Sequence, residues 1–392
     1  MRVDTLILGA GAAGMMCAAF TGGRTLVIDH ARAPGEKIRI SGGGRCNFTN
    51  LGTSPANFLS ANPHFAKSAL ARYTPQDFLS LIARHRIAWH EKTLGQLFCD
   101  DKATQIVAML RAEMTRAGAE LWLSTTLADL SHDGAAFTAT LDREGRRETV
   151  TATHLVLATG GKSIPKMGAT GLAYDIATRF GLKVTETRPA LVPLTFTDSG
   201  FAPLAGVALP ARLSNARASF DEALLFTHRG LSGPSVLQLS SYWREGEAIS
   251  VNLTPAAPLF DSLRAARQSG GRHDIKTELA RHLPTRLAEH LATEWALSGR
   301  LADQSDTALR ALSDRLSDWP LTPSGSEGYR TAEVTLGGID TRGLNSSSME
   351  AKALPGLFAI GEAVDVTGWL GGYNFQWAWA SAHAAGTAIA SR

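Results

Sequence analysis

The sequence predicts an α/β protein in which a domain with a parallel sheet is interrupted by a second, β-rich domain. Three observations lead to this prediction. A strand, a glycine-rich turn, a helix and a second strand follow one another in the first thirty residues. From Pro189 to about Val334 the chain changes to short strands separated by proline and glycine. From Gly356 it returns to a buried strand followed by an apolar helix.

The composition agrees with this class. A chain of 392 residues is long enough for two to three domains at about 150 residues each. Charged residues make up 19%, below the roughly 25% of an average soluble domain, and 38 glycines favour an enzyme rich in glycine loops. The net charge of +3, from 39 basic and 36 acidic residues, neither requires nor excludes a phosphate-bearing partner.

The cysteines and the uncharged stretches indicate the cellular compartment in which the protein is expected. Cys17, Cys46 and Cys99 form no CxxC pair and have no histidine at ligand spacing, which argues against a disulfide framework and against a metal site. The stretches 5–23 and 366–391 hold too many glycine and polar residues for a membrane span. We therefore expect a cytoplasmic protein with no membrane partner.

The first part of the chain is expected to alternate strands and helices. Val3–Leu8 and Leu26–Asp29 are two buried parallel strands, which make half of a Rossmann unit. After a loop rich in glycine and arginine, residues 64–117 are expected to be mainly helical. The next segments, Leu121–Leu123, Ala136–Leu141 and Glu148–Thr151, are expected to form a small meander that leads into a buried strand at Leu155–Ala158.

The second part of the chain suggests an inserted domain, after which the chain returns to the first domain. A charged helical stretch at about 259–317 belongs to the β-rich segment, and a last strand at Gly356–Gly361 precedes a final helix that begins near Asn374. The expected domains are thus 1–189 and 335–392, which together form the nucleotide-binding domain, and the inserted domain 190–334.

The first turn carries a dinucleotide fingerprint. Gly9-x-Gly11-x-x-Gly14 follows a strand and opens a helix, and an acidic residue, Asp29, comes twenty residues after Gly9. Gly9 allows the tight turn, Gly11 lets a pyrophosphate approach the backbone, and Gly14 permits close helix packing. The free N–H groups of the helix and its positive dipole would hold the phosphates, and Asp29 would accept hydrogen bonds from the adenosine ribose. This pattern alone does not separate FAD from NAD.

Three further segments favour FAD. Ala158-Thr159-Gly160 after a meander and Gly361-Glu362 after a late strand are suited to closing a two-part FAD domain over the ribityl chain. The helix that opens at Gly371–Phe375 would direct its N–H groups at the N1/C2 edge of the flavin, where negative charge collects on reduction.

Longer blocks carry a family resemblance. The segments 35–50 (GEKIRISGGGRCNFTN), 225–234 (LFTHRGLSGP), 333–339 (EVTLGGI) and 361–374 (GEAVDVTGWLGGYN) closely resemble the bacterial HI0933-like flavoproteins of the YhiN/BaiN type. The resemblance covers the chain from Met1 to the last helix. It implies a Rossmann-like FAD-binding domain of the two-dinucleotide-binding flavoprotein type, interrupted by a β-barrel-like domain with a helical segment, and it implies non-covalent FAD.

The resemblance also places the loop 35–50 beneath the flavin and adds its residues to the site. Neither a catalytic residue nor a metal ligand is assigned. The predicted cofactor contacts are Gly9, Gly11, Ala12, Ala13, Gly14, Asp29, His30, Lys37, Ser41, Gly42, Arg45, Cys46, Asn47, Ala158, Thr159, Gly160, Gly361, Glu362, Gly372, Tyr373, Asn374 and Phe375.

Two features of the sequence allow a functional and a structural interpretation. Cys46 could be a redox partner of the flavin, but with no second cysteine nearby a buried inert thiol is favoured. A solvated helix face is favoured over a nucleic-acid surface for the basic residues of the helical insert. They are Arg264, Arg267, Arg272, Lys276, Arg281 and Arg286.

The predicted function is that of an FAD-dependent oxidoreductase, a reductase that moves hydride from NAD(P)H, as a transient donor, through FAD to a carbon–carbon double bond of a small molecule. Only one GxGxxG is present, so no separate NAD(P)H domain is visible. Activities in the family are reductions of steroid-like enones and of uridine in ribosomal RNA. The alternatives are therefore an RNA-modifying, uridine-reducing enzyme, for which RNA is the partner, and an FAD-bound structural or sensory module. The oligomeric state is not predicted.

Overall fold

The computed structural model describes residues 1–197 and 200–392, and these divide into two units. Unit 1 consists of Met1–Arg188 and Val334–Arg392, and unit 2 of Pro189–Glu333. The boundaries expected from the sequence, 189/190 and 334/335, lie one residue from these. The chain therefore leaves unit 1 once and returns to it.

A parallel sheet forms the centre of unit 1. Its strands follow the order β7-β2-β1-β10-β20, and each neighbouring pair is parallel. The apolar side chains of β1 and β2 are buried, as expected for a parallel sheet covered on both faces. The bounds of the five strands are β1 Arg2–Leu8, β2 Thr25–Ile28, β7 Glu120–Trp122, β10 Arg146–Leu157 and β20 Leu357–Ala359.

An antiparallel meander continues the same sheet from β10. It consists of β8 (Thr125–His132), β9 (Phe137–Arg143) and the first half of β10. The prediction that Leu121–Leu123 belongs to the meander is wrong, because β7 pairs in parallel with β2 after a helical crossover. The predicted strands Glu148–Thr151 and Leu155–Ala158 are parts of one long strand, β10. A short apolar run indicates a strand but does not reveal which strand it pairs with. Both errors concern this pairing and not the presence of a strand.

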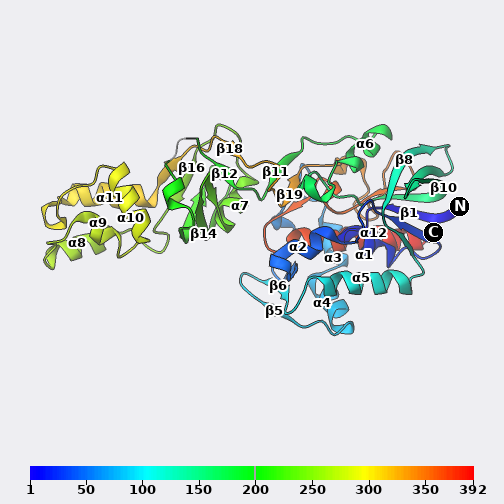
Figure 1. Cartoon of the computed structure of the whole chain (residues 1–392), viewed down its shortest axis with the longest axis horizontal. Helices are drawn as coiled ribbons and strands as arrows, with labels where there is room; N and C mark the ends of the chain where they lie inside the picture. Colours follow the sequence, from blue (N-terminus) through cyan, green and yellow to red (C-terminus); the bar gives the residue numbers. More distant parts are fainter. Residues whose placement is uncertain (198–199) are drawn as a thin grey trace. The chain divides into compact units, whose positions relative to one another are not determined.

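Helices cover the sheet of unit 1. α12 lies near the end of the chain and packs against α1 and α3, which come from the first third of the chain. Figure 1 shows α12 and α1 beside each other. Residues 64–117 hold α3, α4 and α5, as predicted, but also the hairpin β5–β6. These strands of three and four residues are too short to show a period. The bounds are α1 Ala12–Ala18, α3 Lys67–Arg72, α4 Pro75–Arg84, β5 Trp89–Glu91, β6 Gln96–Cys99, α5 Thr104–Arg116 and α12 Tyr373–Ala390.

Small elements complete unit 1. β3 pairs with β6, and β4 pairs with β21, so segments from the two ends of the sequence meet. The remaining elements are α2 Glu36–Gly44, β3 Asn47–Asn50, β4 Phe58–Leu59, α6 Leu172–Arg179, β19 Val334–Leu336 and β21 Thr367–Gly368.

α12 belongs to the core. Trp377 and Trp379 are fully buried, and the ring of Phe78 stacks on Trp379 at 4.6 Å between centroids. The helix is apolar because protein surrounds it. Across the described residues, no helix combines the length and the apolar character needed to cross a membrane.

Unit 2 contains a seven-stranded antiparallel sheet and a group of helices. The strand order is β17-β16-β13-β14-β15-β12-β18. In Figure 1 the helices α8 to α11 gather at one end of this unit, and they fall within the predicted helical stretch. The bounds are β12 Leu194–Thr195, β13 Ala208–Ser214, β14 Ser219–Thr227, β15 Gly230–Ser232, α7 Pro234–Ser240, β16 Ile249–Asn252, α8 Phe260–Gln268, α9 Ile275–Leu279, α10 Thr285–Glu294, α11 Asp306–Ser317, β17 Trp319–Leu321 and β18 Gly325–Ser326; β11 (Arg188–Ala190) spans the first boundary between the units.

Candidate flavin-binding site

The three glycines of the first turn differ in what surrounds them. A Cβ on Gly9, whose φ is 106°, would lie 2.5 Å from the carbonyl oxygen of Ala158. A Cβ on Gly14 would lie 1.9 Å from the carbonyl oxygen of Gly9. A Cβ on Gly11 would meet no other heavy atom within 4 Å. Packing within the protein thus accounts for Gly9 and Gly14, whereas an open space remains at Gly11.

This open space lies at the amino end of α1. The helix begins after Gly11, and no side chain in the described part of the chain caps it. Its first N–H groups are therefore available to an anion. Ala12 is half-buried and Ala13 is buried, and a Cβ on Gly361 would lie 2.8 Å from the methyl of Ala13. The predicted residues of the first turn and of the late strand therefore lie together.

Asp29 stabilises the turn through hydrogen bonds to the backbone. Its Oδ2 accepts a hydrogen bond from the N–H of Ala10 (2.7 Å), and its Oδ1 accepts one from the N–H of Ala31 (2.9 Å). A carboxylate has about four lone-pair positions, so two backbone donors leave capacity for ribose hydroxyls. The exposed His30 lies with Nδ1 3.4 Å from Asp29 Oδ1 and packs against Gly168.

The loop that was expected beneath the flavin is strongly bent. Ser41 leaves the helical conformation, and its Oγ donates to the carbonyl of Ile38 (2.8 Å). Gly42 has a φ of 57°, and a Cβ there would lie 2.8 Å from the ring of Phe98. Gly42 is therefore required by packing, while the neighbouring Gly43, with a φ of 67°, has open space around its Cβ position.

Three residues that were predicted to contact the cofactor lie at the end of this loop and differ in exposure. Arg45 is exposed. Cys46 is fully buried with a φ of 52°, and burial raises the pKa of its thiol. Asn47 is half-buried, and its side-chain amide lies 3.2 Å from that of Gln96. All three cysteines are free, and no cluster of metal-ligating side chains occurs within 1–197 and 200–392.

Lys37 and Glu362 form a polar network that spans the sequence. The Lys37 ammonium donates to Glu362 Oε2 (2.8 Å) and to Ser163 Oγ (2.5 Å). Ser163 Oγ donates to Glu362 Oε1 (2.9 Å), which also accepts the N–H of Thr335 (3.0 Å). Sequence reasoning predicted Lys37 and Glu362 but missed Ser163 and Thr335. Both missed residues lie next to glycine-rich segments, which was the available signal.

The segment after β10 leaves one polar atom without a partner. Ala158 is buried, and Gly160 has a φ of 75°. Thr159 follows the strand, and its Oγ1 is buried with no hydrogen-bond partner among the described residues. A buried hydroxyl without a partner costs free energy, so a ligand group is expected to supply one. The open space at Gly11 and the hydroxyl of Thr159 together fit a bound dinucleotide such as FAD.

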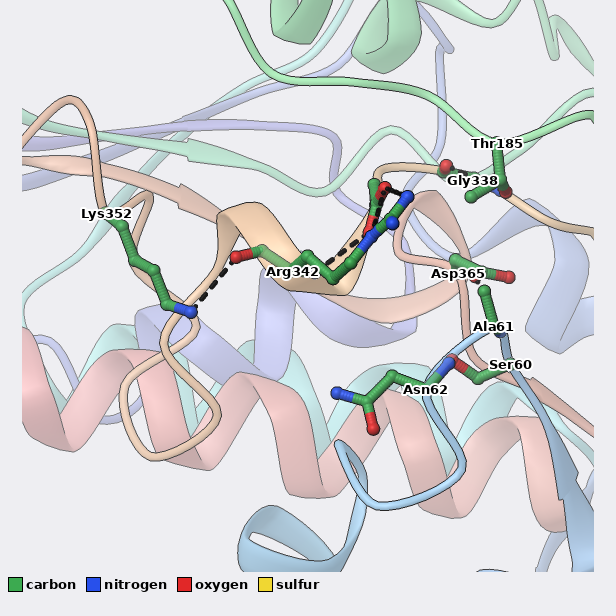
Figure 2. A network of polar contacts seen from close by, with 9 residues as sticks. Ser60, Ala61, Asn62, Thr185, Gly338, Arg342, Lys352 and Asp365 are labelled. Atoms are coloured by element: carbon green, nitrogen blue, oxygen red, sulfur yellow. Dashed lines mark hydrogen bonds and ion pairs between the residues drawn. The ribbon is translucent and has the colours of Figure 1, made fainter.

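A second network fixes the loop that carries Glu362. Figure 2 shows the chain around Gly338 and Arg342 beside Asp365. Asp365 accepts the N–H of Ala61 (3.0 Å), and burial raises the pKa of Asp365. The Arg342 guanidinium donates to Asp340 and holds the pKa of that carboxyl below its usual range. The bond between Ala61 and Asp365 thus connects the backbone just after Glu362 to the segment that follows β4.

Contacts within the protein account for the two glycines before α12. A Cβ on Gly372 would lie 2.4 Å from the carbonyl oxygen of Thr49, and one on Gly371 would lie 3.0 Å from the side chain of Gln96. Both positions therefore leave no room for a larger residue. The N-cap residue of α12 is Gly372, which has no side chain to cap the helix, and the amino end of α12 is a candidate for the flavin edge.

The first residues of α12 also pack within the protein. Asn374 Oδ1 accepts the N–H of Gly368 (2.8 Å), and its Nδ2 donates to the carbonyl of the same residue (2.8 Å). Its side chain thus holds a loop. Tyr373 is buried, and the ring of Phe375 stacks on Trp379 at 5.6 Å. Sequence reasoning missed Gln376, which is fully buried and accepts a hydrogen bond from Thr49 Oγ1 (2.6 Å).

The basic residues of the helical insert largely bond within unit 2. Arg264 and Arg267 pair with Asp306, and Arg281 pairs with Glu278. Arg286 donates to backbone carbonyls of the same unit. These contacts favour the structural interpretation of this group over a nucleic-acid surface.

The fold and the arrangement of these residues define a class. Unit 1 has the Rossmann-like fold of FAD-binding flavoproteins, and unit 2 adds an antiparallel-sheet domain. The chain is a flavin-dependent oxidoreductase. It belongs to the HI0933-like family, whose model, described as "HI0933-like protein Rossmann domain", matches residues 3–388. The predicted resemblance is confirmed.

Individual relatives cover the whole chain. It is 51% identical over 395 residues to the "Ribosomal RNA dihydrouridine synthase" of Escherichia coli (strain K12), covering 98% of this chain and 97% of that protein. It is 27% identical over 413 residues to the "3-dehydro-bile acid delta(4,6)-reductase" of Clostridium scindens, with 98% of both chains covered. The fold resembles that of a 3-ketosteroid delta1-dehydrogenase from Sterolibacterium denitrificans, with a TM-score of 0.54, 15% identity, and coverage of 100% of this chain and 99% of that one.

Proposed function

We propose that this protein is a ribosomal RNA dihydrouridine synthase that uses non-covalently bound FAD. The reaction adds a hydride and a proton across the C5–C6 double bond of a uridine, while NAD(P)H is oxidised to NAD(P)⁺. The observation that carries the proposal is the 51% identity to the Escherichia coli enzyme of that name over 98% of this chain. It favours the RNA alternative over the small-molecule substrate that the sequence placed first.

The residues of unit 1 would divide the binding of FAD among them. The open turn at Gly11 and the free N–H groups of α1 would bind the pyrophosphate, and Asp29 would accept from the ribose. The unpartnered hydroxyl of Thr159 would hydrogen-bond the ribityl chain. FAD itself supplies the two-electron chemistry that links a nicotinamide to the substrate.

Lys37 would provide a fixed positive charge at this site. Its ammonium is held by two acceptors, Glu362 and Ser163, so it loses little freedom when the site fills. A cation in a half-buried position favours negative charge on a neighbouring group. Its expected effect is to stabilise the reduced flavin relative to the oxidised form.

A small-molecule enone reductase remains the second candidate. The 27% identity to the bile-acid reductase of Clostridium scindens also extends over 98% of this chain. Both candidates reduce a carbon–carbon double bond, so the flavin site alone does not separate them. The lower identity makes this candidate the weaker one.

One experiment separates the two. The purified protein should be yellow, should bleach with NAD(P)H without oxygen, and should recover with air. It is then incubated with NAD(P)H and either ribosomal RNA isolated from cells that lack the enzyme or a panel of steroid enones. Nucleoside mass spectrometry is expected to find dihydrouridine in the RNA, and binding is expected to weaken steeply with salt. Reduction of an enone with no dihydrouridine formed would overturn the proposal.

A further inference from the structure

The turn of the β5–β6 hairpin has an unusual residue at its tip. Thr93, Leu94, Gly95 and Gln96 form the turn, in which the N–H of Gln96 donates to the carbonyl of Thr93 (3.0 Å). Leu94 and Gly95 have φ values of 50° and 76°. Positive φ at both central residues is the pattern of a type I′ turn, whose first central position strongly prefers asparagine, aspartate or glycine.

Leucine is unfavourable at this position for two reasons. A left-handed backbone is sterically unfavourable for an L-residue with a bulky side chain. In addition, 64% of Leu94 is exposed to solvent. Among the described residues, Leu94 is the large exposed apolar residue with a positive φ. Strain of this kind is concentrated at functional sites, where the side chain has a use that offsets the cost.

A second exposed leucine lies beside the first. The N–H of Leu51 donates to the carbonyl of Gly95 (2.9 Å), and 46% of Leu51 is exposed. A Cβ on Gly95 would lie 3.4 Å from the Leu51 nitrogen, so the two turns are in direct backbone contact. Leu51 and Leu94, which we call the leucine tips, are thus two exposed apolar residues on adjoining turns.

The leucine tips are rigidly connected to the candidate flavin site. The buried side chain of Asn50 donates to the carbonyl of Leu94 (3.0 Å) and to the carbonyl of Gly371 (2.9 Å), just before α12. A Cβ on Gly52 would lie 3.7 Å from the hydroxyl of Tyr373, the first residue of α12. The leucine tips therefore lie near the amino end of α12, the candidate position of the flavin edge.

Reduction of a uridine within folded RNA requires access to one face of its ring. Hydride adds to C5–C6 from above or below the ring plane, and in stacked RNA neighbouring bases cover both faces. Enzymes that act on a base therefore take it out of the stack, and apolar side chains inserted between bases are one means. Leucine is among the residues used as such wedges.

We propose that the leucine tips insert between bases of ribosomal RNA beside the target uridine and replace the stacking that the uridine loses. The inference rests on the proposed function. The hairpin also provides an exposed cation, Lys92, whose ammonium lies 5.5 Å from the centre of the Phe98 ring and is suited to a backbone phosphate. The occupant is thus an unpaired, stacked segment of RNA.

The test replaces the tip without disturbing the turn. Leu94→Asn keeps a residue that type I′ turns prefer, so it should raise the midpoint of thermal unfolding by about 2–4 °C. Flavin content and bleaching by NAD(P)H should stay at the wild-type level. The kcat/KM for ribosomal RNA should fall about tenfold, and further in Leu51→Asn/Leu94→Asn, because a polar amide replaces the apolar contact with the neighbouring bases.

Two control variants isolate the apolar tip. Glu144→Asn changes a turn with the same φ pattern, at Glu144 and Gly145 between β9 and β10, and should leave the reduction of ribosomal RNA unchanged. Leu94→Met keeps an apolar side chain and should retain most of the activity on RNA. Wild-type kcat/KM in Leu51→Asn/Leu94→Asn would overturn the inference.

Two further results would each overturn the inference, for different reasons. If light scattering shows that Leu51→Asn/Leu94→Asn converts a wild-type oligomer to a monomer, the tips are a contact between copies of this chain and the inference is wrong. If the wild-type protein forms no dihydrouridine in ribosomal RNA at all, the proposed function fails and this inference fails with it.

Discussion

Replacing Gly11 with valine tests whether the first turn binds the pyrophosphate of FAD. Gly11 has a φ of −82°, which valine adopts without strain, and its Cβ position is free of other heavy atoms within 4 Å. The folded protein should therefore accept the side chain, with a change in the free energy of unfolding within about 1 kcal/mol. The branched side chain would occupy the space in which a phosphate is expected.

The expected loss of affinity follows from the hydrogen bonds that the side chain would block. A phosphate at the amino end of α1 would accept at least two backbone N–H bonds. Each charge-assisted bond contributes about 1.5–3 kcal/mol, so losing two costs about 3–6 kcal/mol. At 1.4 kcal/mol for each factor of ten, the Kd for FAD should rise about 10²- to 10⁴-fold.

The assay is a fluorescence titration of flavin-free protein with FAD, together with thermal unfolding followed by circular dichroism. Gly14→Ala is the matched control, because its Cβ would lie 1.9 Å from the Gly9 carbonyl oxygen and should destabilise the fold even without FAD. Gly11→Val should unfold at the wild-type temperature without FAD. A wild-type Kd for FAD in Gly11→Val would refute the assignment of this turn.

The other predictions concern four predicted site residues. Asp29→Ala removes the acceptor of two backbone N–H groups and should weaken FAD binding ten- to a hundredfold, at about 1.5–3 kcal/mol, as measured by titration. Lys37→Met leaves Glu362 without its cation and should lower the flavin midpoint potential by about 20–40 mV, for about 1–2 kcal/mol, in a potentiometric titration in which Lys37→Arg stays near wild type. Cys46→Ser should leave the rate of flavin reduction unchanged in stopped-flow measurements, because the thiol is fully buried; loss of reduction with FAD still bound would contradict this. Asn374→Asp replaces an amide that donates to the Gly368 carbonyl with a carboxylate, and should cost about 1–3 kcal/mol of stability in urea unfolding; an unchanged stability would show that the loop does not depend on it.

The sequence by itself determined the features that depend on neighbouring residues. The turn at Gly9, the order of strand, turn and helix, and the position of Asp29 after β2 follow from local periodicity and turn chemistry. The sequence also predicted an insertion between about Pro189 and Val334, because its character changes there to short strands separated by proline and glycine. The family resemblance added Lys37 to the predicted site, and the position of Glu362 after a late strand had already placed it there.

Only the tertiary structure decided which distant residues meet. Lys37 and Glu362 are 325 positions apart, and nothing local shows that Ser163 lies between them. β7 pairs with β2 rather than with the meander, because pairing depends on the path of the chain between strands. The role of Gly371 and Gly372 became visible only in the structure for the same reason, because Gln96 and Thr49, both from the first hundred residues, block their Cβ positions. Local patterns specify the elements, but contacts between elements depend on how the whole chain packs, and that packing places the leucine tips beside α12.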